Sequence, residues 1–149
     1  MTEITIQAQR GDIKALRLGN PNGMPVLALH GWLDNAASFI PMAHFLAEHN
    51  IIAMDSMGHG ASAHIPKGYD YSFADWLHDI LDVMDALEWQ QAHLLGHSLG
   101  GAVVQLYSGI YPERVKKLVS IEGFGPPPEK LVPRPAPERL RKWIENMRD

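Results

Sequence analysis

The residues most suited to chemistry form the run Gly96-His97-Ser98-Leu99-Gly100, which fits the pattern G-x-S-x-G. A serine at the tip of a sharp turn has strained backbone angles, and side chains two positions away on either side would collide there. Glycine at both positions therefore suits a turn that presents the Ser98 hydroxyl as a nucleophile for acyl transfer. The alternative is an ordinary glycine-rich turn in which Ser98 caps the next helix.

The elements around this pattern predict the setting that such a nucleophile requires. The apolar pair Leu94-Leu95 lies in an expected strand at residues 92–97. A helix is expected at residues 99–111, ended by Pro112, with Gly101 allowing it to approach the sheet closely. Its dipole would favour negative charge developing beside Ser98. This strand–turn–helix order favours the nucleophile over the capping serine.

The other elements predict an α/β fold with a mostly parallel sheet and helices on both faces, because strands and helices alternate along the chain. A hairpin comes first, and a slip in its alternation at Ala15-Leu16 suggests a bulge. The helix at residues 38–48 should bury one face, and the helix that begins at Ser72 should have a capping box with Asp75. The expected elements are strands at 4–8, 13–18, 25–30, 51–55 and 117–122, and helices at 38–48 and from 72 onward, the first of which should bury Phe39, Met42, Phe45 and Leu46.

Three motifs occur in order along the chain: His30-Gly31-Trp32, the run from Asp55 to Ser62, and Gly96-His97-Ser98-Leu99-Gly100-Gly101. Their order and their positions resemble those of α/β-hydrolases, in particular the serine hydrolase-like group of that superfamily. The resemblance runs from the first hairpin to the sixth strand. It implies the α/β-hydrolase fold, truncated after about that strand, and hydrolysis of a carboxyl ester or a related acyl bond.

The resemblance also implies an oxyanion hole, which needs two donors aimed at the carbonyl oxygen. One is the backbone N–H of Leu99, directly after the nucleophile. The other is the N–H of Trp32 in the turn formed by His30 and Gly31, where glycine permits close backbone approach. Alternatively, His30-Gly31 merely ends a strand and Trp32 belongs to the core. Trp32, Leu33 and Leu99 would line an apolar acyl pocket.

A serine nucleophile needs a general base and a carboxylate that orients it. Some relatives carry the acid at the end of the sixth strand, where Glu122 stands, although a solvated carboxylate at a strand end fits equally well. None of the eight histidines follows Glu122, whereas the family's base follows the last strand. We therefore expect residues 1–125 to be the N-terminal part of the core and the proline-rich residues 126–149 to begin a cap. Recruitment of a local histidine such as His59 is the alternative.

The motif from Asp55 to Ser62 is expected to be architectural. An aspartate at a strand end followed by two glycines makes a turn in which its carboxylate binds nearby N–H groups. His59 has no second metal ligand at helical or hairpin spacing. We therefore expect no metal and no cofactor.

Composition limits the remaining functions. The 149 residues are 46% hydrophobic with a net charge of −4 and no cysteine, which predicts one globular domain without disulfides. Without a Lys/Arg cluster, a signal peptide or an apolar run of about 18 residues, we expect neither nucleic-acid nor membrane binding and a cytoplasmic location. The partners expected are a small acyl substrate and, through the unpaired edge of the strand at residues 117–122, a second copy.

Two functions of different classes remain. One is ester hydrolysis through a Ser98 acyl-enzyme, and the other is a non-catalytic scaffold or interaction protein with the same fold. A nucleotide-binding α/β domain is disfavoured because the chain has neither a G-x-G-x-x-G nor a Walker pattern after its first strands.

Overall fold

The computed structural model describes residues 1–123, apart from the side chain of Phe73. They form a six-stranded sheet in the order β1-β2-β4-β3-β5-β6. β1 and β2 form an antiparallel hairpin, β2 is also antiparallel to β4, and β3, β4, β5 and β6 are mutually parallel. The strands are β1 (Thr2–Ala8), β2 (Gly11–Gly19), β3 (Pro25–Leu29), β4 (Asn50–Met54), β5 (Ala92–His97) and β6 (Val115–Ile121). The predicted α/β-hydrolase architecture is confirmed for this part of the chain, and the expected segment 126–149 lies outside it.

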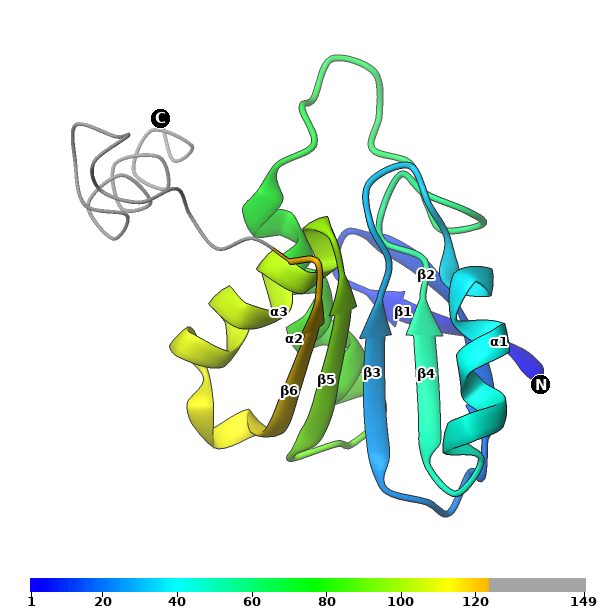
Figure 1. Ribbon diagram of the computed structural model, residues 1–149. Coiled ribbons are helices and arrows are strands. Elements are labelled where there is room, and N and C mark those ends of the chain that lie inside the picture. The colour runs from blue at the N-terminus through cyan, green and yellow to red at the C-terminus, as the bar shows by residue number, and fades with distance from the viewer. Residues whose placement is uncertain (124–149) are drawn as a thin grey trace.

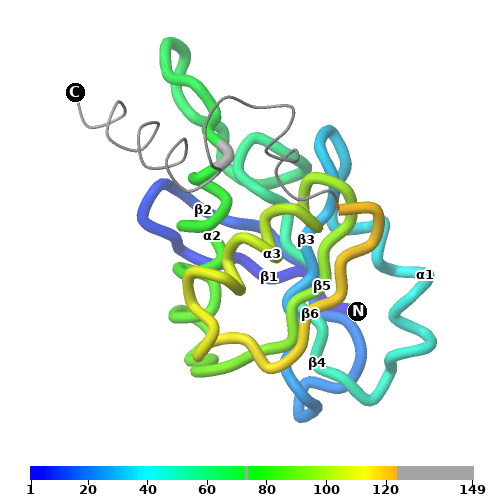
Figure 2. Tube along the Cα trace, turned by 60° about the vertical axis from the view of Figure 1, so that its left-hand side comes forward, coloured from blue at the N-terminus to red at the C-terminus, as the bar shows by residue number. Residues whose placement is uncertain are grey.

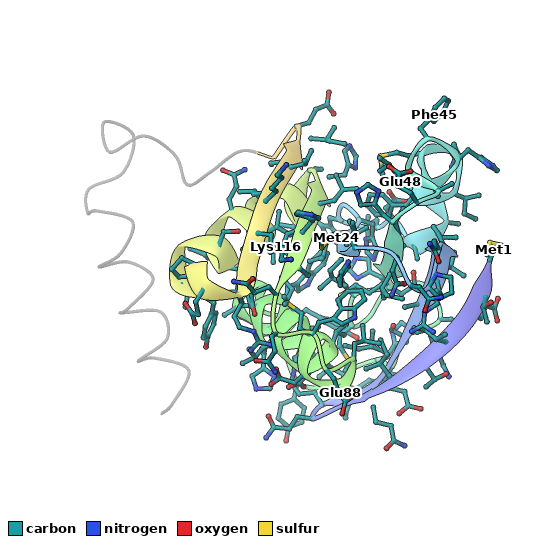
Figure 3. All side chains as sticks on the ribbon, turned by 90° about the horizontal axis from the view of Figure 1, so that it is seen from below. Met1, Met24, Phe45, Glu48, Glu88 and Lys116 are labelled. Atoms are coloured by element: carbon teal, nitrogen blue, oxygen red, sulfur yellow. The ribbon has the colours of Figure 1, made fainter. Side chains whose placement is uncertain are left out.

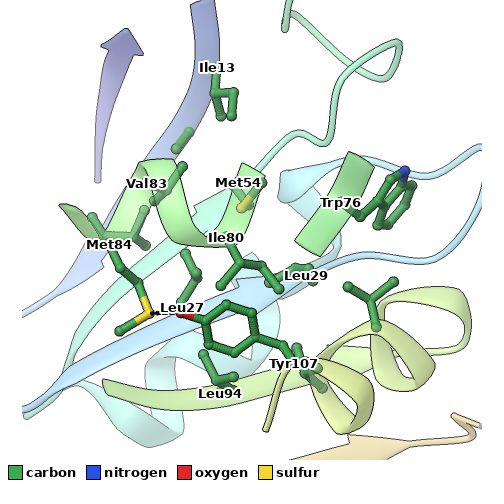
Figure 4. Close-up of a cluster of buried hydrophobic side chains, with 14 of the residues drawn as sticks. Ile13, Leu27, Leu29, Met54, Trp76, Ile80, Val83, Met84, Leu94 and Tyr107 are labelled. Atoms are coloured by element: carbon green, nitrogen blue, oxygen red, sulfur yellow. Dashed lines mark hydrogen bonds between the residues drawn. The ribbon is translucent and has the colours of Figure 1, made fainter. Parts of the chain in front are cut away.

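Helices cover both faces of the sheet, as Figure 1 shows. One face carries α2 (Phe73–Ala86) and α3 (Leu99–Ile110), and the other carries α1 (Ile40–Ala43) between two short 3₁₀ turns. The larger core cluster lies under α2 and α3, where Tyr107 is buried among Leu27, Ile80 and Leu94 (Figure 4). Figure 2 shows α1 on the opposite side of the strands from α2 and α3. Because β3, β4, β5 and β6 are parallel, their carboxyl ends lie at one edge of the sheet between these two layers.

The β1–β2 hairpin forms without the expected bulge. Its register is unbroken from Thr2 opposite Arg17 to Ala8 opposite Gly11. Ile13 and Ala15 pack in the core cluster under α2, whereas Leu16 and Leu18 pack in the cluster on the α1 side. The slip in the hydrophobic pattern therefore marks a change in which face of β2 is buried, because different layers cover the two ends of the strand.

The helix expected at residues 38–48 is broken into three short pieces. A 3₁₀ turn (Ala36–Phe39) precedes α1, and another (His44–Leu46) follows it. Phe39 is buried and Met42 and Leu46 pack beside it, but Phe45 is 85% exposed and points outward (Figure 3). Including Phe45 in the buried face was wrong. Consecutive residues of a 3₁₀ turn differ by about 120°, so Phe45 faces away from the sheet once Leu46 packs toward it.

The β1–β2 hairpin contacts α2 through salt bridges as well as through hydrophobic packing. Ser72 and Asp75 form the predicted capping box at the start of α2. Arg10, in the β1–β2 turn, reaches Asp75 (Nη1–Oδ2 2.9 Å) and Asp79 (Nη2–Oδ1 2.7 Å). Burial raises the pKa of the Asp79 carboxyl, and the Arg10 guanidinium opposes that rise. No helix in residues 1–123 is both long and apolar enough to cross a membrane.

Candidate active site

The serine stands in a strained turn between β5 and α3. Ser98 has φ 53° and ψ −117°, a conformation that costs a non-glycine residue about 1–3 kcal/mol. A Cβ on Gly96 would collide with the carbonyl oxygen of Gly100, and one on Gly100 would collide with the carbonyl oxygens of Leu29 and His30. The glycines at both ends of the motif are therefore required by the turn.

Ser98 is an exposed residue, and its side chain takes no part in capping α3. Ser98 is the N-cap residue, but its side chain accepts no hydrogen bond from the helix. Its backbone is held on both sides: the N–H donates to the Ile121 carbonyl (2.9 Å), and the carbonyl accepts from Ala102 N–H (3.1 Å). The structure thus disfavours the capping alternative and shows, within residues 1–123, a fixed backbone whose hydroxyl has no hydrogen-bond partner.

The turn after β3 passes directly beside Ser98. A Cβ built on Gly31 would lie 3.2 Å from the Ser98 Cβ. The Trp32 amide follows in this turn, and the Leu99 amide opens α3. Within residues 1–123 neither amide donates a hydrogen bond. One expected oxyanion donor therefore lies in the turn that passes beside Ser98, and the other is the first amide of α3, directly after Ser98.

Trp32 and Leu33 do not belong to the core. The Trp32 side chain is 72% exposed and that of Leu33 is 84% exposed, with Leu33 at φ 60°. This excludes the core alternative for Trp32. A hollow of about 260 Å³ adjoins the elbow instead, and its lining mixes polar with apolar side chains: Asp34, Ser38, Phe39, Met42, His97 and Ile121. The Ser38 hydroxyl, bonded to the Asp34 carboxylate (2.6 Å), lowers the pKa of Asp34.

His30 is wholly buried behind the Gly31 turn. Its Nδ1 lies 2.6 Å from the Gly31 carbonyl oxygen, and its Nε2 accepts a hydrogen bond from Ser56 N–H (3.1 Å). The ring packs edge-on to Trp76 of α2, with 5.7 Å between centroids. Burial lowers the pKa of His30. A neutral imidazole therefore joins the ends of β3 and β4.

Asp55 organises the turn after β4 through both of its carboxylate oxygens. One carboxylate oxygen accepts from Ala36 N–H (2.7 Å) and the other from Ala61 N–H (2.9 Å). The Ser62 hydroxyl donates to the Asp55 carbonyl (2.6 Å). This agrees with the expected architectural role, and it ties the loop after β3 to the end of β4.

Glu122 lies at the end of β6 with φ 52° and an 80% exposed side chain. Its Oε2 is 3.6 Å from the Nε2 of His97. The sequence reasoning missed this pair, although a signal existed: His97 and Ile121 end neighbouring parallel strands. In the described part of the chain, Glu122 thus faces a histidine that adjoins Ser98 in sequence, and no hydrogen bond joins a histidine to the Ser98 hydroxyl.

Comparisons with known proteins agree with this geometry. The sequence pattern of the alpha/beta hydrolase fold matches residues 24–149. A probable serine hydrolase of Drosophila melanogaster is 39% identical over 126 residues, which cover 83% of this chain and 38% of the relative. The chain therefore spans well under half the length of that relative.

Two solved structures are similar to most of this chain. A hypothetical protein from Pseudomonas aeruginosa PAO1 superposes with a TM-score of 0.82 at 39% identity, over 99% of this chain and 50% of that one. Naproxen esterase (carboxylesterase NP) from Bacillus subtilis superposes with a TM-score of 0.74 at 26% identity, over 87% of this chain and 47% of its own.

Proposed function

The chain belongs to the alpha/beta hydrolase fold family, and we propose that it carries the nucleophile and the oxyanion hole of a serine hydrolase acting on small acyl esters. The observation that carries the proposal is the strained and exposed Ser98, whose side chain and two neighbouring amides, Trp32 N–H and Leu99 N–H, form no hydrogen bond within residues 1–123. Backbone strain of this kind persists only where the surrounding structure imposes it, and it is concentrated at functional sites. The relatives with serine hydrolase names support the same reaction class.

In the proposed reaction, Ser98 Oγ attacks the ester carbonyl carbon and passes its proton to a general base. The carbonyl oxygen becomes an oxyanion that accepts hydrogen bonds from the Trp32 and Leu99 amides, and each such donor is worth about 10²–10³ in rate. Collapse of the tetrahedral intermediate breaks the bond to the alkoxy oxygen, which leaves as the alcohol with the proton from the base. Water then cleaves the Ser98 acyl-enzyme and releases the acid.

The base is proposed to be a histidine outside this sequence. Residues 124–149 contain no histidine, and no histidine of residues 1–123 is hydrogen-bonded to Ser98. The Drosophila relative extends well beyond the matched region. Glu122 is proposed as the acid that orients this base, in keeping with its position at the end of β6. Loss of one triad member leaves only about 10³–10⁴-fold acceleration over water, so we expect these 149 residues alone to be slow.

The experiment is covalent labelling of the 149-residue chain with a neutral fluorophosphonate, with added imidazole as an external base. Intact-mass and peptide mass spectrometry should find one adduct on Ser98, formed faster as the imidazole concentration rises. Ser98→Ala should remove the adduct, and Ser108→Ala, at a serine bonded to the Val104 carbonyl in α3, should not. Equal labelling of wild type and Ser98→Ala would overturn the proposal.

A second candidate function is association through β6. In the described part of the sheet, β6 pairs only with β5. Leu118, Val119 and Ile121 are 39%, 52% and 40% exposed, and an unpaired edge with apolar side chains is a template for another strand. We propose a homodimer formed at this edge. Size-exclusion chromatography with light scattering should give a dimer that Val119→Lys converts to a monomer, and a wild-type monomer at all concentrations contradicts this candidate.

A further inference from the structure

We propose that His30 is a positioning residue: its imidazole holds the Gly31 carbonyl so that the Trp32 N–H is aimed at the oxyanion beside Ser98. The inference rests on the proposed function in one respect, namely that the Trp32 amide serves as an oxyanion donor. It assigns a task to a buried side chain that itself cannot touch a substrate, since His30 is 0% exposed.

The contacts of His30 fix which ring nitrogen carries the proton. Nε2 accepts from the Ser56 N–H (3.1 Å), so it must be unprotonated. The proton is therefore on Nδ1, which lies 2.6 Å from the Gly31 carbonyl oxygen and donates to it. The same carbonyl also accepts from Asp34 N–H (3.3 Å). The Gly31 carbonyl oxygen is thus held by two donors, the His30 imidazole and the Asp34 amide.

Peptide geometry transmits this constraint to Trp32. The Gly31 C=O and the Trp32 N–H belong to one planar trans peptide unit and point in opposite directions; the chain contains no cis peptide bond in its described residues. Because the carbonyl is directed toward the buried imidazole, the amide is directed away from the interior. Gly31 itself lies against Ser98, with its built Cβ 3.2 Å from the serine Cβ. Fixing the carbonyl therefore fixes the donor.

Packing holds the imidazole in this orientation. Trp76 and His59 lie on the ring at centroid distances of 5.7 and 5.1 Å. The charged or titratable groups that influence it are His59, Asp55 and Asp34. A second proton on Nε2 would face the Ser56 N–H, so the arrangement requires the neutral ring. His30 thus couples the end of β4 to the orientation of the amide after β3.

Two amide substitutions separate the two bonds of the ring. His30→Asn can place its side-chain N–H₂ near the Nδ1 position and still donate to Gly31, but it cannot reach Ser56. His30→Gln can place its carbonyl oxygen near the Nε2 position and still accept from Ser56, but it loses the donor to Gly31. Both variants should lower the Tm. His44→Gln, at an exposed histidine in the turn after α1, is the matched control.

The two variants should differ in the rate at which a fluorophosphonate labels Ser98 in the presence of imidazole. His30→Gln should reduce the maximal rate at least about tenfold, approaching the loss of one oxyanion donor, with the half-saturating probe concentration within about twofold of wild type because the bond matters only in the transition state. His30→Asn should keep the rate within about threefold. Equal rates for the two variants would overturn the inference.

A measurement without activity keeps the inference distinct from the proposed function. Nitrogen-15 NMR of the chain should show His30 protonated on Nδ1 only, and the Trp32 amide resonance should move in His30→Gln but not in His30→Asn. The Nε2–H tautomer, or an unmoved Trp32 resonance in both variants, would refute the positioning role. Absence of any Ser98 adduct in wild type, with these NMR results as expected, would remove the proposed function alone.

Discussion

Two glycine-containing turns at the same edge of the sheet look alike in sequence and differ in structure. Gly58-His59-Gly60 follows β4, and Gly96-His97-Ser98-Leu99-Gly100 follows β5. In the first turn the carboxylate of Asp55 accepts two backbone N–H groups and the Ser62 hydroxyl is bonded. In the second, Ser98 is exposed and strained, and its hydroxyl caps nothing.

The difference shows how the chain divides architecture from chemistry. The two hydrogen bonds accepted by the Asp55 carboxylate join the β4 turn to the loop after β3 and hold that loop in place. In the β5 turn the Ser98 backbone is bonded to Ile121 and Ala102, whereas its hydroxyl has no hydrogen-bond partner among residues 1–123. Substitutions that remove the hydrogen bonds of the β4 turn should therefore lower the free energy of unfolding. Loss of the Ser98 hydroxyl should abolish labelling and leave the free energy of unfolding nearly unchanged.

Among the substitutions that compare the two turns, Gly100→Ala is expected to lower the free energy of unfolding the most. The Cβ of Gly100→Ala would collide with the backbone carbonyls of Leu29 and His30, so β3 and α3 must separate. We expect a loss of about 3 kcal/mol in the free energy of unfolding, measured with urea, together with loss of Ser98 labelling.

Gly109→Ala in the same helix is the matched control. Nothing lies within 4 Å of a Cβ at Gly109. Alanine there should stabilise the chain by about 0.5–1 kcal/mol, because glycine disfavours a helix interior. Equal effects at positions 100 and 109 would mean that the elbow is not closely packed.

Asp55→Ala tests the structural role of the turn after β4. It leaves the Ala36 and Ala61 amides without their acceptor, and we expect a loss of about 2 kcal/mol in unfolding free energy. Ser98→Ala should change that quantity by less than about 0.5 kcal/mol. A larger loss for Ser98→Ala than for Asp55→Ala would reverse the assigned roles of the two turns.

Ser98→Gly tests the strain in the elbow. Glycine tolerates φ 53° where serine does not. Relief of about 1–3 kcal/mol of strain, partly offset by the greater entropy of glycine in the unfolded chain, should raise the unfolding free energy by about 1 kcal/mol. Differential scanning calorimetry should therefore show a higher Tm in a variant that is no longer labelled. An unchanged or lower Tm contradicts stored strain.

The smallest effect is a pH dependence at His30. Burial lowers its pKa from 6.5, so the folded state disfavours protonation. Its contribution to stability is full above pH 6.5 and is lost as pH falls from 6.5 toward the lowered pKa. The unfolding free energy of His30→Asn should fall less steeply than that of wild type over this range. Parallel pH profiles would show that His30 is not held neutral.

The sequence anticipated most elements because their patterns are local. The capping box of Ser72 with Asp75 and the strand that precedes Ser98 formed as predicted. Two predictions were wrong because burial depends on which layer covers a residue. Leu16 packs in the core cluster on the α1 side of the sheet and does not mark a bulge. Phe45 lies outside the helical face that packs on the sheet. The spacing of hydrophobic residues predicts whether a segment is a helix or a strand. It does not predict which neighbouring element will cover each of its faces.

By itself the sequence determined the elbow and the order of the motifs, because glycine and serine spacing limits a turn through steric exclusion within a few bonds. Only the tertiary structure decided which groups meet across the edge of the sheet. His97 approaches Glu122, and His30 links Gly31 to Ser56, because neighbouring strands that are distant in sequence end together. Hydrogen bonds act over about 3 Å, a separation that sequence distance does not encode.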